Sequence, residues 1–396
     1  MLGAIYTGLS GMNAFSQGLQ TISDNVTNLN TLGYKASTTT FSDLYSQSGG
    51  GLSYSGGGTD SSGSGVRFNT PQIDFSDGQL QQTGGDLDLA IQGSGFLVLK
   101  DGDSTYYTRT GQFAVGDDGY VALQGTKYQL SVLDAAGQPQ AVNVDSKRVR
   151  APTATTKVVF SDNLSSTGTS ATVSNIKVYD ANGGAHTWSV GLVPVGTSSP
   201  GDWTVTVTDE TGATVGSGTI GFVGGAPDPA NSTLTVTTTP ANAPALSVLL
   251  DFSQGVTSFS GGTTSTLRVG SSDGQAVGDL TGVTVDQTGQ IQLTYSNGAT
   301  DVAGSVALAD FRDPQELQRV GSGLFQDKGH GPMRYVASGA DGVGSLVSKE
   351  LEGSNVNLSQ EFGDLILIQR GFQASSQVVS VANDMLQQLF GIRGQA

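Results

Sequence analysis

Two histidines and a few paired aspartates are the side chains of this chain that could carry acid–base or metal chemistry. His186 stands beside Thr187 and Trp188 in a strand-like stretch, and neither it nor His330 has a catalytic partner at a recognisable spacing. A Ser-His-Asp arrangement stays open, because a fold can bring any histidine near a serine. We predict that His186 is a surface residue of a strand.

The aspartates suggest equally ordinary roles. Asp86 and Asp88 flank Leu87, and paired carboxylates can serve as acid and base. Because residues two apart on a strand share a face, we interpret them as a solvated strand face. Four further aspartates lack the spacing of a calcium loop and are predicted in turns: Asp101, Asp103, Asp117 and Asp118. With no hydrolase, P-loop or zinc-protease motif, the sequence predicts a protein that is not an enzyme and uses no cofactor or metal.

Composition excludes further classes of function. The chain has 18 basic and 34 acidic residues, a net charge of −16, so its overall field would not attract nucleic acid or anionic membranes. It contains no cysteine, which excludes disulfides and thiolate metal sites. The sequence contains no stretch of about 18 apolar residues, so we predict no membrane span. The first residues lack a signal-peptide pattern, so we expect any export to proceed without a cleaved signal.

The strongest periodic pattern lies at the two ends of the chain. Residues 1–30 carry apolar side chains in a seven-residue repeat: Leu2, Ile5, Leu9, Met12, Leu19, Ile22 and Val26. Residues 355–396 carry a matching set: Leu358, Phe362, Leu365, Phe372, Val379, Leu386 and Leu389. Such a repeat places a narrow apolar stripe on one side of a helix. We predict two long helices that pair with each other, as in a coiled coil, and with neighbouring copies.

These helices are expected to need partners. Gly3, Gly8, Gly11 and Gly18 weaken the first helix by up to ~1 kcal/mol each relative to alanine. We expect the two helices to have no third partner within the chain. Their pairing would then leave apolar and glycine faces uncovered, which favours packing between copies.

The interior of the chain is predicted to be β structure, so the fold class is mixed and mainly β. Short Thr/Val strands and hairpin turns predict a β-sandwich or barrel at 149–279. The connector is rich in Gly and Ser at residues 46–65. Its candidate anchors precede that stretch: Phe41, Leu44 and Tyr45. The predicted domains are nested: an inner helical domain (1–30 plus 355–396), a connector (31–70 plus 345–354), a middle β domain (71–148 plus 280–344) and an outer β domain (149–279).

Four arginines are candidates for specific pairs between domains or between subunits: Arg67, Arg109, Arg312 and Arg319. Ordinary surface charge is the alternative interpretation. The low overall charge, 13% of residues, makes each isolated basic side chain more informative than in an average protein.

Several long motifs resemble those of bacterial flagellar rod and hook subunits. Residues 10–14 and 24–35 are similar to the N-terminal signature of this family, with Asn25, Asn28, Asn30, Gly33, Tyr34 and Lys35 as its motif residues. Residues 351–356 and 369–374 resemble the C-terminal signature, with Asn355, Gln369 and Arg370. Residues 87–96 and 107–113 resemble the shared middle-domain motif. Three segments resemble hook rather than rod sequences: 178–187, 295–298 and 306–311. Rod subunits resemble a shorter version of the hook protein that lacks the inserted outer domain.

The resemblance implies a structural subunit of the flagellar hook, a curved hollow helical polymer that passes torque from rod to filament as a universal joint. It implies many copies of the chain as partners, together with the distal rod, the hook cap, the hook–filament junction protein and the flagellar type III export apparatus. The implied location is the hook, outside the cell. Alternatives are a distal rod subunit, a junction protein, or a secreted β-rich adhesin with an aromatic groove near Trp188 and Trp203.

Overall fold

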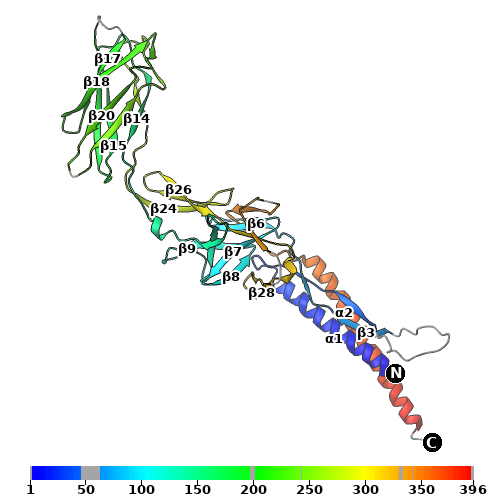
Figure 1. Ribbon diagram of the computed structural model, residues 1–396. Coiled ribbons are helices and arrows are strands. Elements are labelled where there is room, and N and C mark those ends of the chain that lie inside the picture. The colour runs from blue at the N-terminus through cyan, green and yellow to red at the C-terminus, as the bar shows by residue number, and fades with distance from the viewer. Residues whose placement is uncertain are drawn as a thin grey trace, which may run out of the picture. The chain divides into compact units, whose positions relative to one another are not determined.

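The computed structural model describes residues 2–45, 63–196, 201–241, 243–329, 333–340 and 342–393 (Figure 1). The chain forms two compact units, which are described separately. Unit 1 comprises Met1–Asp145, Thr284–Gln292 and Val302–Ala396, and unit 2 comprises Ser146–Val283 and Leu293–Asp301. A helix at each end and strands throughout the interior confirm the mixed, mainly β fold class. Residues 46–62 of the expected Gly/Ser-rich connector lie outside the described residues, as does His330.

Two helices of unit 1, α1 (Leu2–Thr27) and α2 (Leu358–Arg393), pack side by side (Figure 1). Gly8 lies opposite Ser375 and Val379, whereas Gly18 lies opposite Ile368. Because positions further along α1 meet positions further back along α2, the helices are antiparallel. This arrangement confirms that the two ends of the chain pair with each other.

The glycines of α1 are contact positions rather than weak points alone. A Cβ atom on Gly8 would lie 2.7 Å from Val379 Cγ2, and one on Gly11 would lie 2.6 Å from Ser375 Oγ. On α2, a Cβ atom on Gly371 would lie 2.5 Å from the ring of Phe15. The expectation that glycine faces stay uncovered was therefore wrong for Gly8, Gly11 and Gly18, because the absence of a side chain is what lets the two backbones approach, whereas Gly3 is exposed.

A β-hairpin of β2 (Phe41–Tyr45) and β3 (Gly63–Phe68) supplies a third partner for the helices. Phe41 packs against Phe15 of α1 at 5.4 Å between ring centroids, and the Val66 amide donates to Ser10 Oγ at 3.2 Å. The prediction that the helices lack a third partner within the chain was wrong for this reason. Phe41 is an anchor as expected, Leu44 is exposed, and the side chain of Tyr45 lies outside the described part.

A twelve-stranded sheet forms the β body of unit 1, in the order β28-β29-β8-β7-β11-β10-β9-β6-β31, with β12 beside β11, β27 beside β7 and β30 beside β27. Its core is aromatic, with Phe96, Tyr107 and Phe325 buried. Its strands are β6 (Asp88–Gln92), β7 (Phe96–Asp101), β8 (Ser104–Thr108), β9 (Thr110–Val115), β10 (Val121–Leu123), β11 (Gln129–Leu133), β12 (Pro139–Ala141), β27 (Leu308–Phe311), β28 (Gln318–Gly321), β29 (Leu324–Gln326), β30 (Met333–Val336) and β31 (Ser345–Ser348).

Short strand pairs connect this body to the helices. One pair is β1 (Ser37–Thr38) with β4 (Gln72–Ile73), and the other is β5 (Leu80–Gln82) with β32 (Glu350–Glu352). Two short 3₁₀ helices, η1 (Asp145–Lys147) and η2 (Pro314–Glu316), complete the local elements. Strand β32 leads within a few residues into α2, so the register of this small pair fixes where the C-terminal helix begins.

Unit 2 contains two five-stranded sheets that share one core. Trp188, Trp203, Phe160 and Phe252 are buried there, and the two phenylalanine rings stack at 4.3 Å. One sheet runs β15-β16-β17-β18-β19, and the other runs β20-β21-β14-β22 with β23 beside β14. The strands are β14 (Lys157–Asn163), β15 (Ala171–Tyr179), β16 (Ala185–Pro194), β17 (Asp202–Thr208), β18 (Thr214–Val223), β19 (Ala226–Pro227), β20 (Thr233–Thr238), β21 (Leu246–Asp251), β22 (Val256–Thr257) and β23 (Arg268–Ser272).

A four-stranded sheet contains the segments in which the chain passes between the units in sequence: β13 (Val149–Arg150), β24 (Gly278–Val285), β25 (Gln290–Tyr295) and β26 (Thr300–Ser305). The turn at Gly298, with φ of 78°, joins β25 to β26, and Gly183 provides the expected turn between β15 and β16. Among the helices that the structure describes, none is long and apolar enough to cross a membrane.

The close approach of the helices gives a first prediction. Gly8→Ala should destabilise the helix pair by about 1–3 kcal/mol, because the new methyl group meets Val379 and the Ser375 carbonyl oxygen at 3.1 Å. Gly363→Ala is the matched control in α2, since nothing lies within 4 Å of its Cβ position, and it should stabilise by up to ~1 kcal/mol. Hydrogen exchange of α1 and α2 amides measures both changes. Equal effects of the two variants would contradict close packing at Gly8.

Candidate functional site

The seven-residue repeats divide between a buried interface and an exposed surface. Of the predicted positions in α1, Ile22 is buried, Ile5, Met12 and Val26 are half-buried, and Leu9 and Leu19 are exposed. The side chain of Leu2 lies outside the described part. In α2, Leu365, Val379 and Leu386 are half-buried, whereas Leu358, Phe362, Phe372 and Leu389 are exposed. The structure therefore brings only part of the predicted set into contact.

Small residues make most of the contact between the helices. Gly8, Gly11, Ala14 and Gly18 of α1 are buried, at a spacing of three or four residues. Ala382 and Ile368 are the buried apolar residues on the facing side of α2. Phe15, Ile368 and Val379 pack against the glycines of the opposite helix, while many other large apolar side chains of both helices lie outside the interface.

One exposed apolar row follows the C-terminal half of α2. Val378, Val381, Met385 and Leu389 recur at three or four residues, each close to half exposed. With Ala4 of α1 and Ala374, three of them line a shallow apolar groove of about 520 Å³. Soluble monomers rarely expose continuous apolar stripes of this length, so the row has the character of a docking surface.

A second exposed row begins at the first turn of α2. Leu358, Phe362 and Ile366 recur every four residues, and Phe362 is 50% exposed. On α1, Tyr6 and Leu9 form a shorter exposed pair, with Leu9 at 56%. The helix pair thus presents apolar side chains on several sides at once, which one covering element could not bury.

Asn25 fixes the end of α1 against α2. Its side-chain nitrogen donates to Glu361 Oε1 and to the Ser37 carbonyl oxygen, both at 2.9 Å. Its side-chain oxygen accepts from the Ser37 amide at 2.9 Å and from the Tyr34 hydroxyl at 3.2 Å. Asn25 is almost fully buried and makes all of these hydrogen bonds. A shorter or apolar side chain would therefore leave several buried polar groups without partners.

A cluster of charges, here called the buried joint, brings together the buried side chains of Lys35, Arg109 and Glu352 and the partly exposed side chain of Asp77. Lys35 Nζ lies 2.6 Å from Glu352 Oε1, and both side chains are fully buried. Arg109 Nε lies 3.4 Å from Glu352 Oε2, and its Nη2 lies 2.5 Å from Asp77 Oδ1. Two positive and two negative groups balance, which is the condition under which charges are tolerated in a protein interior.

Backbone groups satisfy the rest of the buried joint. Arg109 Nη1 donates to the carbonyl oxygens of Gly93 and Gly95 at 2.6 and 2.9 Å, and Lys35 Nζ donates to that of Ser76 at 2.7 Å. The Gly78 amide donates to Glu352 Oε1 at 2.7 Å. Burial lowers the pKa of Lys35, and the nearby Glu352 carboxylate acts in the opposite direction. The joint therefore ties the N-terminal motif, the sheet and the C-terminal motif to one point.

Neighbouring motif residues reinforce this junction. Gly33, with φ of 66°, donates its amide to the Glu352 carbonyl oxygen at 2.8 Å. Asn355 accepts from the Ala36 amide at 2.7 Å and donates to the Asp74 carbonyl oxygen at 2.8 Å. Arg319 stacks on the Tyr34 ring at 5.0 Å and donates to the Lys35 carbonyl oxygen. The motif residues thus converge on the junction, except Gln369 and Arg370, which are exposed on α2.

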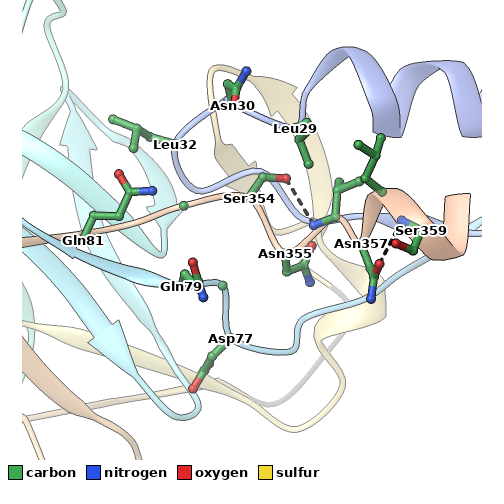
Figure 2. A pocket seen from close by; sticks show the side chains of 14 residues that line it. Leu29, Asn30, Leu32, Asp77, Gln79, Gln81, Ser354, Asn355, Asn357 and Ser359 are labelled. Carbon is green, nitrogen blue, oxygen red and sulfur yellow. Dashed lines mark hydrogen bonds between the residues drawn. The ribbon is translucent and has the colours of Figure 1, made fainter.

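A polar groove of about 710 Å³ lies beside the junction (Figure 2). Figure 2 shows Asn30 and Leu32 on the segment after α1, with Asp77 and Gln79 on the opposite wall. Asn28 donates to the Asp24 carbonyl oxygen at 2.8 Å and so helps end α1 at this groove. Asn357 accepts from the Ser359 amide at 3.0 Å and caps the start of α2.

The candidate catalytic residues do not form a catalytic site in the described part. His186 was expected to lack a partner, but its Nε2 lies 3.1 Å from Asp180 Oδ2 and its Nδ1 lies 3.7 Å from Glu210 Oε1. The hairpin turn brings Asp180 back beside the imidazole, and this hydrogen bond lowers the pKa of Asp180. The described residues contain no group of three or more metal-ligating side chains.

The paired aspartates separate. Asp86 is exposed and lies 2.8 Å from Lys349 Nζ, whereas Asp88 is buried within β6. The interpretation as one solvated face was wrong for Asp88, because β6 is covered on both faces. Of the four candidate arginines, Arg109 and Arg319 make specific contacts within unit 1, while Arg67 and Arg312 are exposed. Sequence reasoning missed Glu352 as a site residue, although an acid beside the buried Leu351 in a motif was a usable signal.

Three family descriptions match the segments that build this junction and the sheet. Residues 5–35 match "Flagella basal body rod protein", residues 90–163 match "Flagellar hook protein FlgE/F/G D1 domain", and residues 347–392 match "Flagellar basal body rod FlgEFG protein C-terminal". The first and last matches contain the N-terminal and C-terminal motifs, and the middle match contains the middle-domain motif from residue 90 onward, in the order that the resemblance implies.

Similarity to individual proteins extends over nearly the whole chain. The flagellar hook protein FlgE of Treponema pallidum is 28% identical, covering 99% of this chain and 100% of the relative. Those of Salmonella typhimurium and Rhizobium meliloti are 28% and 29% identical, covering 97% and 99% of this chain and 98% and 99% of the relatives. The crystal structure of Helicobacter pylori flagellar hook protein FlgE2 aligns with 62% of this chain and 93% of its own at 12% identity, with a TM-score of 0.45.

The paired terminal helices, the junction motifs and these matches define an axial structural protein. The chain belongs to the family of flagellar rod and hook proteins. Within that family it belongs with the hook proteins, because the relatives that match over its full length are hook proteins. The rod alternative is not favoured for the same reason.

The buried joint gives a second prediction. Glu352→Gln and Lys35→Met should each destabilise unit 1 by about 3–5 kcal/mol, because each leaves a buried charge without its partner. The double variant should cost less than the sum of the two, since it removes both charges together. Hydrogen exchange of unit 1 amides during urea titration measures the losses.

Two controls accompany this cycle. Lys127→Met breaks a solvent-exposed pair with Asp101 and should change stability little. The fluorescence of Trp188 and Trp203 reports unit 2, so it should change little in the joint variants. Strict additivity of the two single losses would contradict a direct Lys35–Glu352 interaction.

The pH dependence of helix docking gives a third prediction. Burial raises the pKa of Glu361, while the hydrogen bond from Asn25 acts in the opposite direction. The folded state therefore holds this proton more tightly, and the contribution to stability is complete below the unfolded pKa and lost as pH rises through the folded pKa. Lowering the pH from 7.5 to 5 should increase protection of α2 amides 358–368 in the monomer. Glu361→Gln should abolish the difference; an unchanged pH dependence in that variant would assign it to other groups.

Proposed function

We propose that this chain polymerises through its terminal helices into a curved hollow hook that acts as a universal joint between rod and filament. The observation that carries this proposal is the division of the helix pair into a small-residue interface and exposed apolar rows. The interface is complete within one copy, so the exposed rows are available only to other copies. Hook relatives over the full length make a hook structural subunit the function that this arrangement serves.

In the proposed mechanism the helix pairs form the inner layer of the tube. Each row buried between copies contributes roughly 25 cal/mol per Å² of apolar surface. A single copy leaves these rows in water, so its helices are less stable than those in the polymer. Assembly and helix stability would then increase together.

The β regions would supply the outer layers of the wall. The chain is rich in Gly, Ser and Thr, and only 13% of its residues are charged. Such surfaces form few strong directional contacts, so neighbouring copies could adopt several packings of similar energy as the hook turns. We assign the outer region, 149–279, to side-to-side contacts that set curvature.

The same proposal covers partners and location. The two ends of the hook polymer would contact the distal rod and the hook–filament junction protein, and the hook cap would guide growth. The flagellar type III export apparatus would deliver the chain outside the cell without a cleaved signal. The role is structural, without catalysis or cofactor. The adhesin alternative is weakened because Trp188 and Trp203 are both buried in the unit 2 core and cannot line a glycan groove.

Electron microscopy of basal bodies from a strain lacking this gene gives a fourth prediction. Rods should be complete and end without a hook. Hooks without filaments would assign the protein to the junction, truncated rods would make it a rod subunit, and intact flagella would favour the adhesin.

Complementation distinguishes the helices from other exposed apolar sites. Val381→Asp, in the exposed row of α2, should fail to restore hooks, because a charge there would be buried between copies. Val193→Asp, at an exposed apolar residue of β16 in unit 2, should restore them. Failure of both variants with normal protein levels would contradict a special role for the helix row.

A further inference from the structure

Two segments of unit 2, 149–153 and 275–279, run side by side as an antiparallel pair, here called the neck. It begins with the pairing of β13 and β24, and beyond them the backbones of Thr153 and Gln275 exchange two hydrogen bonds, both 2.9 Å long. The sandwich formed by the two five-stranded sheets lies between these segments in the chain, so its backbone continues to other elements only through the neck. A lone two-stranded ribbon twists easily and is weak, so whatever packs beside the neck decides whether it bends.

A turn of the sandwich packs directly on the neck. Gly183, with φ of 87°, lies at the turn between β15 and β16. A Cβ atom on Gly183 would lie 3.1 Å from Pro152 Cβ and 3.1 Å from Val277 Cγ2. Pro152 belongs to one segment of the neck and Val277 to the other, so this one glycine touches both.

Asp180 holds that turn in shape. Its Oδ1 accepts hydrogen bonds from the amides of Asn182 and Gly184 at 2.8 and 2.9 Å. Its Oδ2 lies 3.1 Å from His186 Nε2, across the hairpin. Gly183 is therefore presented to the neck by a turn whose backbone is fixed at both ends.

A second turn, between β25 and β26, holds the same neck from the four-stranded sheet. The side-chain nitrogen of Asn297 donates to the Ala276 carbonyl oxygen at 2.8 Å, and its side-chain oxygen accepts from the Ala299 amide at 3.0 Å. A Cβ atom on Gly278 would lie 2.6 Å from Asn297 Cγ. The stretch from Ala276 to Gly278 thus contacts a turn from each of two sheets.

Tyr295 of β25 holds the other segment of the neck. Its hydroxyl donates to the Lys147 carbonyl oxygen at 3.0 Å, and the guanidinium of Arg150 lies 5.9 Å from the centre of its ring. The Tyr295 side chain is buried, so these contacts are shielded from water. Both segments of the neck are therefore attached to β25 and the turn that follows it.

From these contacts we infer that the neck is braced, so that the sandwich and the part of the four-stranded sheet that belongs to unit 2 move as one rigid piece. Bending at the neck would separate Gly183 from Pro152 and Val277 or break the hydrogen bond from Asn297 to Ala276. A hinge needs residues that are free to change their backbone angles, and the neck lacks that freedom.

The bracing has a consequence for the proposed hook, and this consequence rests on the proposed function. Unit 2 contains the region to which we assign the side-to-side contacts that set curvature. With a braced neck, a force on the sandwich is passed to the four-stranded sheet instead of swinging the sandwich freely. The bracing itself is a property of a single copy.

Spin labels measure this rigidity in the full chain, which has no cysteine of its own. Thr235→Cys on β20 and Thr294→Cys on β25 place one label on each side of the neck, both at exposed positions of unit 2. Double electron–electron resonance on the monomer should give a single narrow distribution of distances between the labels. A broad distribution, or two separate distances, would overturn the inference.

Two glycine variants test the turn of the sandwich. Gly183→Ala should broaden the distribution about twofold, because the new methyl group meets Pro152 and Val277 and pushes the turn away from the neck. Gly212→Ala, in the turn between β17 and β18, is the matched control. Its φ of 83° gives a similar backbone cost, but nothing lies within 4 Å of its Cβ position, so the width should not change.

Asn297→Asp tests the second turn. The carboxylate keeps the shape of the side chain and still accepts from the Ala299 amide, but it cannot donate to the Ala276 carbonyl oxygen. This variant should also broaden the distribution. The fluorescence of the buried Trp188 and Trp203 is the control that each variant keeps a folded sandwich.

Unchanged widths in both Gly183→Ala and Asn297→Asp, or equal broadening by Gly212→Ala, would overturn bracing by the two turns. The measurement needs no polymer, so its failure is distinct from that of the proposed function. If the gene deletion left hooks intact, the mechanical consequence would fail, whereas the label distances would still decide whether the neck is rigid.

Discussion

The buried joint around Glu352 is the interaction on which the remaining structure depends. Lys35 brings the N-terminal segment to it, Arg109 brings the central sheet, and Glu352 leads directly into the C-terminal helix. Each of these charges would be costly in the protein interior alone, and together they compensate one another. The arrangement therefore forms only when all three segments are in place, and it sets the position from which both helices leave the β body.

From that fixed position the helices use some side chains to pack against each other and other side chains to form an exposed apolar surface. Glycines of each helix receive side chains of the other, as Gly8 receives Val379 and Gly371 receives Phe15, so the pair needs few large apolar residues to hold itself together. Other large apolar side chains, such as Phe362, Val381 and Met385, then remain at the surface, where one copy alone does not bury them. A design that placed leucine between the helices would make a more stable monomer with less surface left for its neighbours. Self-assembly thus follows from the choice of which residues pack within the chain.

Much of this could be predicted from the sequence, and the failures have physical causes. The helices, the hairpin turn at Gly183 and the family motifs were all visible, because periodicity and motif order are local properties. The seam between the helices was misplaced, because the repeat was searched in large apolar residues while Gly8 and Gly18 carry the contact. Pairing of Glu352 with Lys35 and Arg109 could not be predicted, since sequence alone does not say which distant charges meet. Domain boundaries remain a prediction.

Lys35 and Glu352 are separated by 317 positions in the chain. Closing a loop of that length carries a large entropic cost, which grows with the logarithm of its length, and contacts of such high sequence separation are slow to form. Within the sandwich, the sheet β15-β16-β17-β18-β19 pairs only consecutive strands and has no such delay, whereas β14 pairs with the distant strands β21, β22 and β23. We therefore expect the consecutive strands β15 to β19 to pair early, and the joint that aligns the two helices to be among the last contacts made. A newly made chain is then expected to pass through a stage in which its two terminal helices are not yet paired.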